Sequence, residues 1–454
     1  MWIRPINRAA LVLAAGFLTV GGSAQNLPAA TANGQAQAAD KKPASSGPMT
    51  LARALDAALN NDDMAVARGT AAAAQADVVA ADRAPFPTLS ARLSSIDLQN
   101  GLGDGNLLTE KRIDKGVGID WVWERGNKRG LRTRAAQRSA SAAQGDLEET
   151  QIQQLLAAVN AFFDLAAAQE RVTQVEAISS GTAEIASAAA RRVKAGDLAR
   201  QDALRLEIEA ERSKGDVLTV DLERRRAAQA LSLVLDLDPT DQLVTVQAKW
   251  PALSAASGEP NVMVGALSAM VDARPDVRAA EERVAAAQAA LEGASAQKKA
   301  DITWGVSYDH FPGTSTGLIE LRMQMPLQLG YQFQGETARA LAQREAAEGA
   351  LDKVRRTAAL ELQGLQAQLR NANRRSQSFE QDILPRARQV ASQAEFAYAR
   401  GALTLNDLLD ARRTLRATGL EALSARAEHA KTATAWRLRT QPFALVLNEL
   451  NQGQ

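Results

Sequence analysis

The sequence predicts a mainly α-helical protein that contains two structural repeats and four amphipathic β-strands. Long stretches are built from Ala, Leu, Gln, Glu and Arg, which are strong helix formers, and aromatic residues make up only 4% of the chain. One pattern of helices and extended segments occurs twice. In the extended segments, apolar and polar residues alternate. Together these observations favour long helices packed side by side, with strands of the type that a membrane β-barrel uses.

The N-terminus has the layout of a secretory signal peptide. Arg4 and Arg8 precede an apolar run from residue 9 to 20, and small residues follow, so we assign the signal peptide to residues 1–24. The run is too short for a membrane-spanning helix, and no later segment has the roughly 18 apolar residues that one needs. Residues 25–48 have little to bury and are expected to be a disordered lead-in. The protein is therefore expected to be exported.

Two repeats and a C-terminal tail follow the lead-in. The first repeat covers residues 49–250, the second covers 251–440, and the tail covers 441–454. Ala54-Leu55 in the first repeat resembles Ala266-Leu267 in the second, and each pair lies near the start of a helical stretch. The expected helices span about 49–84, 131–194 and 199–235 in the first repeat, and about 263–298, 335–399 and 404–437 in the second.

Each repeat also contains two segments with the period-two alternation that is typical of strands. These expected strands lie at about 87–98, 112–123, 301–309 and 316–326. Alternation fits a membrane barrel and equally the core of a soluble sandwich. A barrel of this kind needs about eight strands or more, and an open sheet edge cannot face lipid. Four strands per chain therefore form either a small soluble sheet or a barrel pooled between subunits. The export signal and the repeat favour pooling.

The longest helix of each repeat is expected to end at a glycine, Gly196 or Gly401. A chain reversal often needs positive φ, which glycine adopts without strain. A second helix then returns, and Asp202 or Asp407 lies near its start, where a carboxylate caps the helix or favours its dipole. Pro385 is expected to kink the long helix of the second repeat. The result is a long helical hairpin that is present twice.

Composition and motifs exclude several other functions. The chain carries 53 basic and 52 acidic residues, so it has no basic excess for binding nucleic acid. It has no cysteine, and its only histidines, His310 and His429, are far apart. Motifs for phosphate binding and for an activated serine are also missing. We therefore expect no catalytic residue, no metal site and no cofactor.

The complete pattern resembles the TolC-type outer-membrane factor family. Helix, two strands, long helix, glycine tip and returning helix occur twice, over nearly the whole mature chain. Ile383-Leu384-Pro385-Arg386-Ala387 and Asp407-Leu408-Leu409-Asp410-Ala411 are similar to that family's second tip hairpin, and Arg274-Pro275-Asp276-Val277 is similar to its second-repeat opening.

A finer resemblance concerns the turn between strand and helix. Residues 124–130 are similar to the Glu-x-Gly-Gly-Lys-Arg turn of the cobalt–zinc–cadmium branch, with Asn127 in place of the second glycine. Phe333-Gln334-Gly335-Glu336-Thr337 resembles that branch's second-repeat helix opening. Many relatives carry a lipidated N-terminal cysteine, which this chain lacks, so barrel insertion alone is expected to anchor it.

The resemblance implies a homotrimer in the outer membrane. Each chain would give four strands to a twelve-stranded barrel, and the helices would form a tunnel across the periplasm. Such a channel passively conducts substrate from a periplasmic adaptor (a membrane fusion protein) and an inner-membrane pump of the resistance–nodulation–division type. The metal branch makes divalent heavy-metal cations the expected cargo. The alternatives are a general drug or dye efflux duct, a type I secretion duct, or a periplasmic coiled-coil adaptor.

Three groups of residues are candidate functional residues, and each has a purely structural alternative. The tips would dock the adaptor or gate the channel, or serve only as turns and helix starts. The aromatic girdle of a barrel equally resembles aromatics in any half-buried sheet. The residues at the strand-to-helix turn would influence substrate choice, or simply lie at the barrel rim. These groups are the tips Gly196, Asp202, Gly401 and Asp407; the girdle Trp121, Trp123, Trp304 and Tyr308; and the turn Glu124, Gly126, Lys128 and Arg129.

Overall fold

The computed structural model describes residues 47–95, 99, 113–237, 244–253, 264–311 and 315–441. The predicted signal peptide, the lead-in up to residue 46 and the tail after Gln441 lie outside the described residues. So do residues 96–98 and 112, at the loop ends of the first two predicted strands. Every element below belongs to one compact unit, which begins at Ser46.

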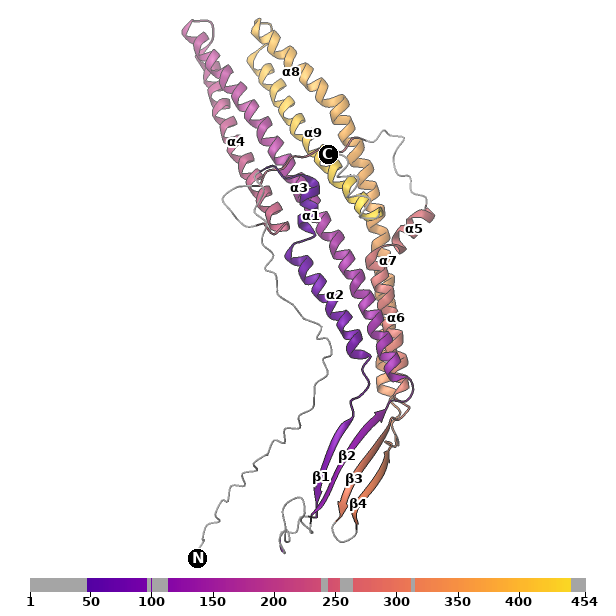
Figure 1. The fold of residues 1–454 in the computed structure, drawn as a ribbon. Coiled ribbons are helices and arrows are strands. Elements are labelled where there is room, and N and C mark those ends of the chain that lie inside the picture. The colour runs from indigo at the N-terminus through magenta and orange to yellow at the C-terminus, as the bar shows by residue number, and fades with distance from the viewer. Residues whose placement is uncertain are drawn as a thin grey trace, which may run out of the picture. The chain divides into compact units, whose positions relative to one another are not determined.

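The described residues of the first repeat form four helices, with one break that was not predicted from the sequence. The segment expected as one helix over 49–84 forms two, because the side chain of Asn61 caps a new helix by accepting a hydrogen bond from the backbone N–H of Met64 at 3.0 Å. The long helix is 67 residues and so about 100 Å in length. The helices are α1 (Leu51–Ala58), α2 (Asp62–Ala81), α3 (Lys128–Lys194) and α4 (Arg200–Val234) (Figure 1).

The second repeat follows the same order, with two interruptions caused by proline. The helix expected over 263–298 is broken before Pro275, which sits in the first turn of the next helix, where its missing N–H costs nothing. The long run contains a π-helical turn, Ser378–Ile383, immediately before the helix that holds Pro385. The helices are α5 (Val264–Asp272), α6 (Pro275–Ala296), α7 (Gln334–Gln377), α8 (Leu384–Ala399) and α9 (Leu405–Thr440).

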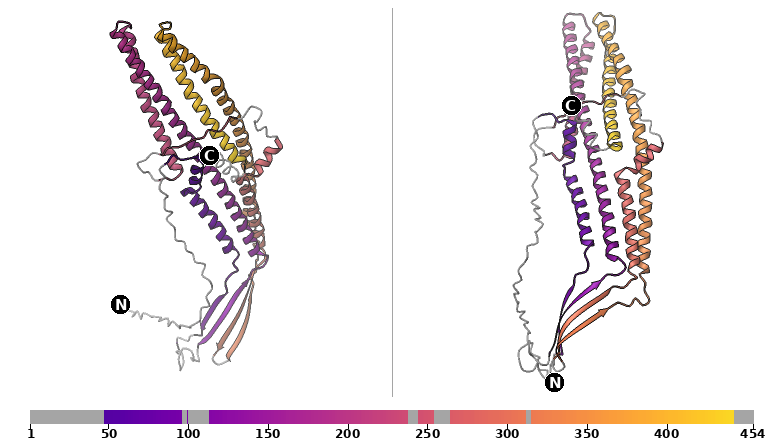
Figure 2. Two further views of the ribbon diagram at one scale, coloured as in Figure 1. Left: turned by 45° about the horizontal axis from the view of Figure 1, so that its top comes forward. Right: turned by 45° about the vertical axis from the view of Figure 1, so that its right-hand side comes forward.

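The four strands form one antiparallel sheet in the order β1-β2-β3-β4. The two repeats meet in its middle, where Ile119 pairs with Val306 and Trp121 pairs with Trp304. Both views place the sheet at the end of the helices opposite to the α3–α4 and α8–α9 turns (Figure 2). The strands are β1 (Thr88–Ser94), β2 (Asp114–Trp123), β3 (Ile302–Phe311) and β4 (Ser315–Gln324), close to the predicted segments.

The main apolar core lies about halfway along α3. Leu155, Phe162 and Phe163 are at most 1% exposed, and they pack with residues of α1, α4 and α9. A segment between the repeats, residues 244–253, joins this core, and its Val246 forms an isolated parallel bridge with Met49. Complete burial of such a side chain contributes about 1.5–3 kcal/mol, so this cluster stabilises helices that are otherwise rich in alanine.

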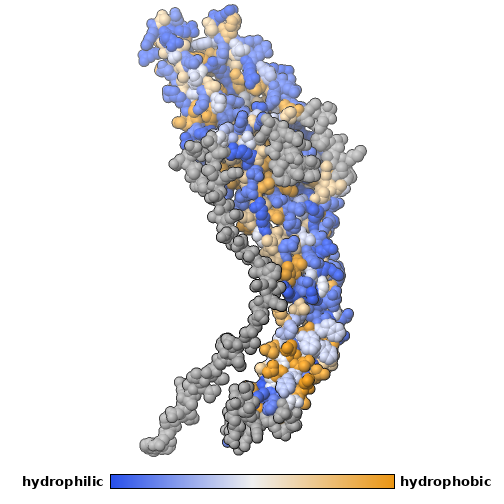
Figure 3. Space-filling view, in the orientation of Figure 1, coloured by the Kyte–Doolittle hydropathy of each residue, from blue (hydrophilic) through white to orange (hydrophobic). Residues whose placement is uncertain are grey.

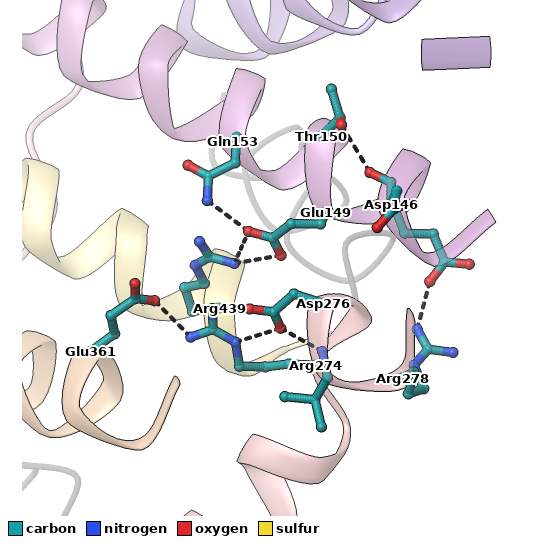
Figure 4. A network of polar contacts seen from close by, with 11 residues as sticks. Asp146, Glu149, Thr150, Gln153, Arg274, Asp276, Arg278, Glu361 and Arg439 are labelled. Atoms are coloured by element: carbon teal, nitrogen blue, oxygen red, sulfur yellow. Dashed lines mark hydrogen bonds and ion pairs between the residues drawn. The ribbon is translucent and has the colours of Figure 1, made fainter. Parts of the chain in front are cut away.

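Ion pairs between the repeats and within the second repeat lie next to this core (Figure 4). Arg439 of α9 donates to both carboxylate oxygens of Glu149 on α3, each at 2.9 Å. Arg274, before α6, binds Asp276 at 2.7 Å and Glu361 of α7 at 3.0 Å. Arg439 and Arg274 are 8% and 4% exposed. Buried guanidinium groups must be paired. The Arg439 contact therefore fixes α9 of the second repeat on α3 of the first, and the Arg274 contacts fix the start of α6 on α7 within the second repeat.

Candidate functional sites: the sheet, the strand-to-helix turns and the helical tips

One face of the sheet is apolar and exposed. Its side chains lie opposite one another across the strands, as in the row Leu89, Ile119, Val306 and Leu321. Leu321 is 80% exposed and Ile119 52%. The space-filling view shows hydrophobic residues gathered over the sheet, whereas the helices are mostly hydrophilic (Figure 3). A contiguous apolar surface of this kind marks contact with a membrane or a partner, not with water.

The other face of the sheet is polar and contains a cross-strand ion pair. Arg322 of β4 donates to Asp120 of β2 at 2.6 Å, although β3 lies between these strands. The two side chains meet above Gly305, which is opposite both of them in the register. A Cβ at Gly305 would lie 2.2 Å from the nearer Asp120 oxygen. Glycine is therefore what allows this pair to lie flat against the sheet.

A second carboxylate on the polar face also lies over a glycine of the neighbouring strand. Asp309 lies opposite Gly116, and a Cβ at Gly116 would come within 2.0 Å of an Asp309 oxygen. Ser307 donates to the other oxygen at 2.6 Å, and Asp309 is only 1% exposed. Two glycines thus seat two carboxylates on the face that is opposite to the apolar one.

The predicted girdle residues all lie on the apolar face, but not in one row. Trp121 pairs directly with Trp304, and Trp123 pairs with Ile302, so the tryptophans gather at the helix end of the sheet. Tyr308 is four residues further along β3, roughly 13 Å away at the rise of a strand. All four side chains are 38–59% exposed. Their positions fit contact with an interface between apolar and polar surroundings.

The turn from β2 into α3 is built by backbone geometry and by a buried ion pair. Gly126 and Asn127 both have positive φ, at 76° and 57°. Asn is the residue other than glycine that best tolerates this conformation, which explains how it replaces the family's second glycine. Lys128 is 8% exposed, and its ammonium group binds Asp301 at 2.8 Å. Asp301 also accepts from the backbone N–H of Arg125, so it ties the start of β3 to this turn.

Two surface ion pairs complete this turn. Arg129 binds Asp82 at the end of α2 at 3.1 Å, and this hydrogen bond lowers the pKa of the Asp82 carboxyl. Glu124 accepts from Arg132 at 3.0 Å. Thus the charged residues of the turn hold α2, α3 and the sheet together, and this structural role accounts for Glu124, Lys128 and Arg129 without any substrate. Sequence reasoning missed Asp301, because an acid at a strand start carries no distinct signal.

The tips have the same backbone arrangement in both repeats. Gly196 and Gly401 have φ of 86° and 75°, and nothing lies within 4 Å of a Cβ placed at either residue. At each tip, the residue after the glycine donates its backbone N–H to a carbonyl in the last turn of the preceding helix. Asp197 donates to Arg192 at 2.9 Å, and Ala402 donates to Ala397 at 2.9 Å. The glycines are therefore required by the turn, and the space around them is open.

The two tip carboxylates play unequal parts. Asp407 accepts from the Thr404 hydroxyl at 2.6 Å, and the Asp407 N–H donates to the same hydroxyl at 3.3 Å. Thr404 is thus the N-cap of α9, a role that the Thr-x-x-Asp spacing indicates and that sequence reasoning had given to the acid. Asp202 lies in the first turn of α4, where it favours the helix dipole, but the N-cap there is Ala199, which has no capping side chain.

A cavity of about 420 Å³ separates the two hairpins near the tips. It is lined by residues of α3, α4, α8 and α9, including Leu206 and Leu408. Two arginines of α9 cross from one hairpin to the other: Arg413 binds Glu209 at 3.1 Å and Arg416 binds Asp216 at 2.6 Å. Both partners belong to α4. Leu405 of α9 also packs in a small apolar cluster with α3 and α4, so partly exposed ion pairs, this cluster and a cavity lie between the hairpins here.

Within the described residues, no helix is long and apolar enough to cross a membrane. Over the same part of the chain, no group of three or more His, Asp or Glu side chains is arranged to hold a metal ion.

A sheet with one apolar and one polar face, continuous with two long helical hairpins, defines the class of channel-forming outer-membrane proteins. A model of the family described as "Outer membrane efflux protein" matches residues 55–236 and 266–438, well over half of the chain. The protein therefore belongs to the outer membrane efflux protein family. The two matched segments correspond to the two repeats.

Individual relatives agree with this assignment. The chain is 25% identical over 296 residues to the cobalt-zinc-cadmium resistance protein CzcC of Cupriavidus metallidurans, covering 64% of this chain and 68% of that one. The fold matches the CmeC outer membrane channel of Campylobacter jejuni, with a TM-score of 0.72, 15% identity and coverage of 88% and 89%. It also matches the open state of the MtrE outer membrane channel of Neisseria gonorrhoeae, with a TM-score of 0.68, 18% identity and coverage of 86% and 88%.

The protein is an outer-membrane efflux channel of a tripartite system, with its helical tunnel in the periplasm, and it is not an enzyme. Channels with this fold form trimeric barrels. In the described part of the chain, β1 and β4 each have one edge without a partner strand, and the apolar face is exposed. Such a barrel requires both features, because closure pairs every edge and lipid covers the apolar side.

Proposed function

We propose that this channel conducts divalent heavy-metal cations. The observation that carries the proposal is the similarity to a cobalt-zinc-cadmium resistance protein over 64% of this chain. The strand-to-helix turn at residues 124–130, which resembles that branch, lies within the matched family segment. Drugs, dyes and the polypeptides of type I secretion remain the competing cargoes, because the pump largely selects what enters the tunnel.

The polar face of the sheet supports a cationic cargo. In a closed barrel this face lines the lumen. Among the described residues it carries four carboxylates and two guanidinium groups per chain, and one of those guanidiniums is bound to a carboxylate. Carboxylates that line a pore favour the passage of cations. These residues are Arg92, Asp114, Asp120, Asp309, Glu320 and Arg322.

The tips are the proposed contact for a periplasmic adaptor, and a resistance–nodulation–division pump is the proposed source of energy. The space around Gly196 and Gly401 is open, so neither tip is covered by its own chain. The two hairpins would gate the tunnel by moving relative to each other. Arg413 and Arg416 contribute to holding them together through partly exposed ion pairs, which are worth about 1 kcal/mol each and so break readily. Asp202 and Asp407, at the starts of the returning helices, would add negative charge at this end.

The cargo is tested in a strain that lacks the gene. We expect it to accumulate zinc, cobalt or cadmium, and the intact gene to restore normal metal content, whereas tolerance to dyes and antibiotics stays unchanged. Complementation with Leu321→Arg, which places a charge on the apolar face, is the control for channel insertion. Sensitivity to dyes or antibiotics with normal metal content would contradict metal as the cargo and leave a general efflux duct.

Adaptor docking is tested by cross-linking, which the cysteine-free chain makes simple. Single variants Asp197→Cys and Ala402→Cys place a thiol beside each tip glycine, and Ser139→Cys places one far along α3 as a matched control. We expect a cross-linked complex of channel and adaptor from the two tip variants alone. Equal cross-linking from Ser139→Cys, or none from the tips, would reject docking at this position.

A further inference from the structure

The long helical run of the second repeat contains a compliant turn that the first repeat lacks. The π-helical turn Ser378–Ile383 interrupts the regular hydrogen-bond ladder, and Pro385 removes a donor just beyond it. α3, with Ser180 at the corresponding position, is continuous from end to end. A π turn beside proline is a site where a helix bends, so the second hairpin has a pivot and the first has none.

One arginine connects this turn to the rest of the molecule. Arg426 of α9 lies 3.6 Å from Glu380 in the π turn and 3.8 Å from Glu170 on α3. Its guanidinium carbon also lies 4.9 Å from the centre of the Trp250 ring. Phe379, the neighbour of Glu380, points inward and packs with Ala422 and Ala425 of α9. The π turn is thus held on one side by an apolar contact and on the other by Arg426.

Trp250, in turn, is fixed to the first repeat. Its ring stacks on Phe163 at 5.6 Å, and its indole N–H donates to Glu170 at 2.6 Å. The segment that carries it is anchored as well, because the N–H of Val246 donates to the Gln169 side chain at 2.9 Å. Phe163 belongs to the main core. Arg426 therefore joins a rigid part of the first repeat to the compliant part of the second.

We propose that Glu170, Trp250, Glu380 and Arg426 form a latch that sets the position of the second tip hairpin and so controls opening of the channel. The latch acts as a positioning device at the pivot, far from the tips. This inference rests on the proposed gating between the hairpins. Beyond the latch, the described hairpins are linked by the partly exposed ion pairs of Arg413 and Arg416 and by a small apolar cluster around Leu405, with the cavity between them. These contacts are few, so a small rotation at the pivot disturbs little packing.

The contacts of Arg426 in the latch are weak enough to break and form again. Arg426 is 40% exposed, and its carboxylate contacts are longer than normal hydrogen bonds, so each contributes little alone. The buried pair of Arg439 and Glu149 is different, because breaking it would leave a charge without a partner inside the bundle. The latch therefore opens without unfolding the repeat, whereas the buried pair stays closed.

The test uses the purified full-length channel in planar bilayers. Glu380→Gln and Arg426→Gln each remove the ion pair at the π turn, and Trp250→Phe keeps the stacking but loses the hydrogen bond to Glu170. We expect a rise of about two- to fivefold in open probability for the two charge variants, as loss of one exposed pair per chain gives. The double variant should show no more than the larger single effect. The control Glu348→Gln removes a comparable ion pair, that with Arg344 on α7, and should change nothing.

Amide hydrogen exchange of the same proteins tests the latch independently of the proposed gating at the tips. Loss of the latch should speed amide exchange over residues 378–399 and leave the tip of α3 unchanged. Unchanged exchange in that segment would overturn the latch, whatever the conductance. If Arg413→Gln and Arg416→Gln raise the open probability but the latch variants do not, the gate stands and the latch is rejected. Faster exchange with no conductance change in any variant would reject the gate at the tips and leave the restraint on the π turn.

Discussion

At the scale of single residues, the two strand-to-helix turns show how unlike sequences reach one geometry. Asn127 and Phe333 immediately precede α3 and α7, and both are left-handed, with φ of 57° and 54°. Asn adopts this conformation readily, but a bulky residue such as Phe is strained in it. Local contacts hold Phe333 there: its ring lies 5.9 Å from that of Tyr331, whose hydroxyl donates to Glu336 at 2.6 Å.

His429 supplies a prediction at the same scale. It is 4% exposed on α9, and burial, followed by the charge of Arg437, lowers the pKa of its imidazole below 6.5. The unfolded chain therefore binds a proton at this residue more readily than the folded chain does. Stability that is present above about pH 6.5 is then lost as the pH falls towards the lower pKa of the folded state. We expect His429→Gln to reduce the drop in Tm between pH 7.5 and pH 5 in detergent. An identical drop in the variant would show that His429 does not contribute.

At the scale of elements, the long helices are specified by different means in the two repeats. α3 is one continuous helix, whereas its counterpart comprises α7, a π turn and α8. Where α3 meets α6, a Cβ at Gly145 would lie 3.0 Å from that of Ala279, so these helices pack through small residues at close approach. Helices that touch through such small side chains gain little from burial, and ion pairs therefore carry much of their register.

The buried pair of Arg439 on α9 and Glu149 on α3 tests how much an ion pair between helices contributes to stability. Arg439→Met would leave the largely buried Glu149 carboxylate with Gln153 as its one hydrogen-bond donor among the described side chains. We expect a loss of about 3–5 kcal/mol, the usual effect of removing one partner of a buried pair. Arg278→Met removes a half-exposed pair between α6 and Glu148 of α3 and should cost less than about 1 kcal/mol. Denaturation in detergent measures both, and equal losses would mean that burial of the pair has no special weight.

At the scale of the whole molecule, the sheet is the part that one chain cannot complete. On its apolar face Leu321 and Val306 are 80% and 38% exposed, and the edges of β1 and β4 have no partner strand among the described residues. Three sheets closed into one barrel remove the edges, and lipid covers the outer face. Assembly and insertion in the membrane are therefore conditions for a stable sheet.

Two substitutions on opposite faces of the sheet separate lipid contact from lumen contact. Leu321 lies on the apolar face and Gln324 on the polar face of the same strand. Leu321→Arg should destabilise the inserted channel by about 2–4 kcal/mol, the effect of arginine at the middle of the bilayer, and lower its amount in outer-membrane fractions. Gln324→Arg should leave that amount unchanged and alter only ion selectivity. Equal loss of both variants from the membrane would contradict the assignment of the two faces.

Much of this architecture follows from local sequence. The four strands, the two long helices and the glycine tips each carry a short-range signal: period-two alternation, helix-forming composition and a glycine at the reversal. Breaks such as the one at Asn61 are harder to predict, because an Asn within a helical composition caps a helix only if the chain turns there. The π turn is equally silent in sequence, since Pro385 predicts a disturbance but not its form.

The sequence by itself determined the order of the elements, the repeat and the two faces of the sheet, because these depend on residues a few positions apart. Only the tertiary structure decided that Lys128 binds Asp301, that Arg322 reaches Asp120 across Gly305, and that Trp250 and Arg426 meet at the π turn. The partners in these contacts are separated by more than 170 residues of sequence, and a single charged or aromatic residue carries no mark of a distant partner. Packing of whole helices and strands brings such residues together, so their roles are fixed only when the fold is complete.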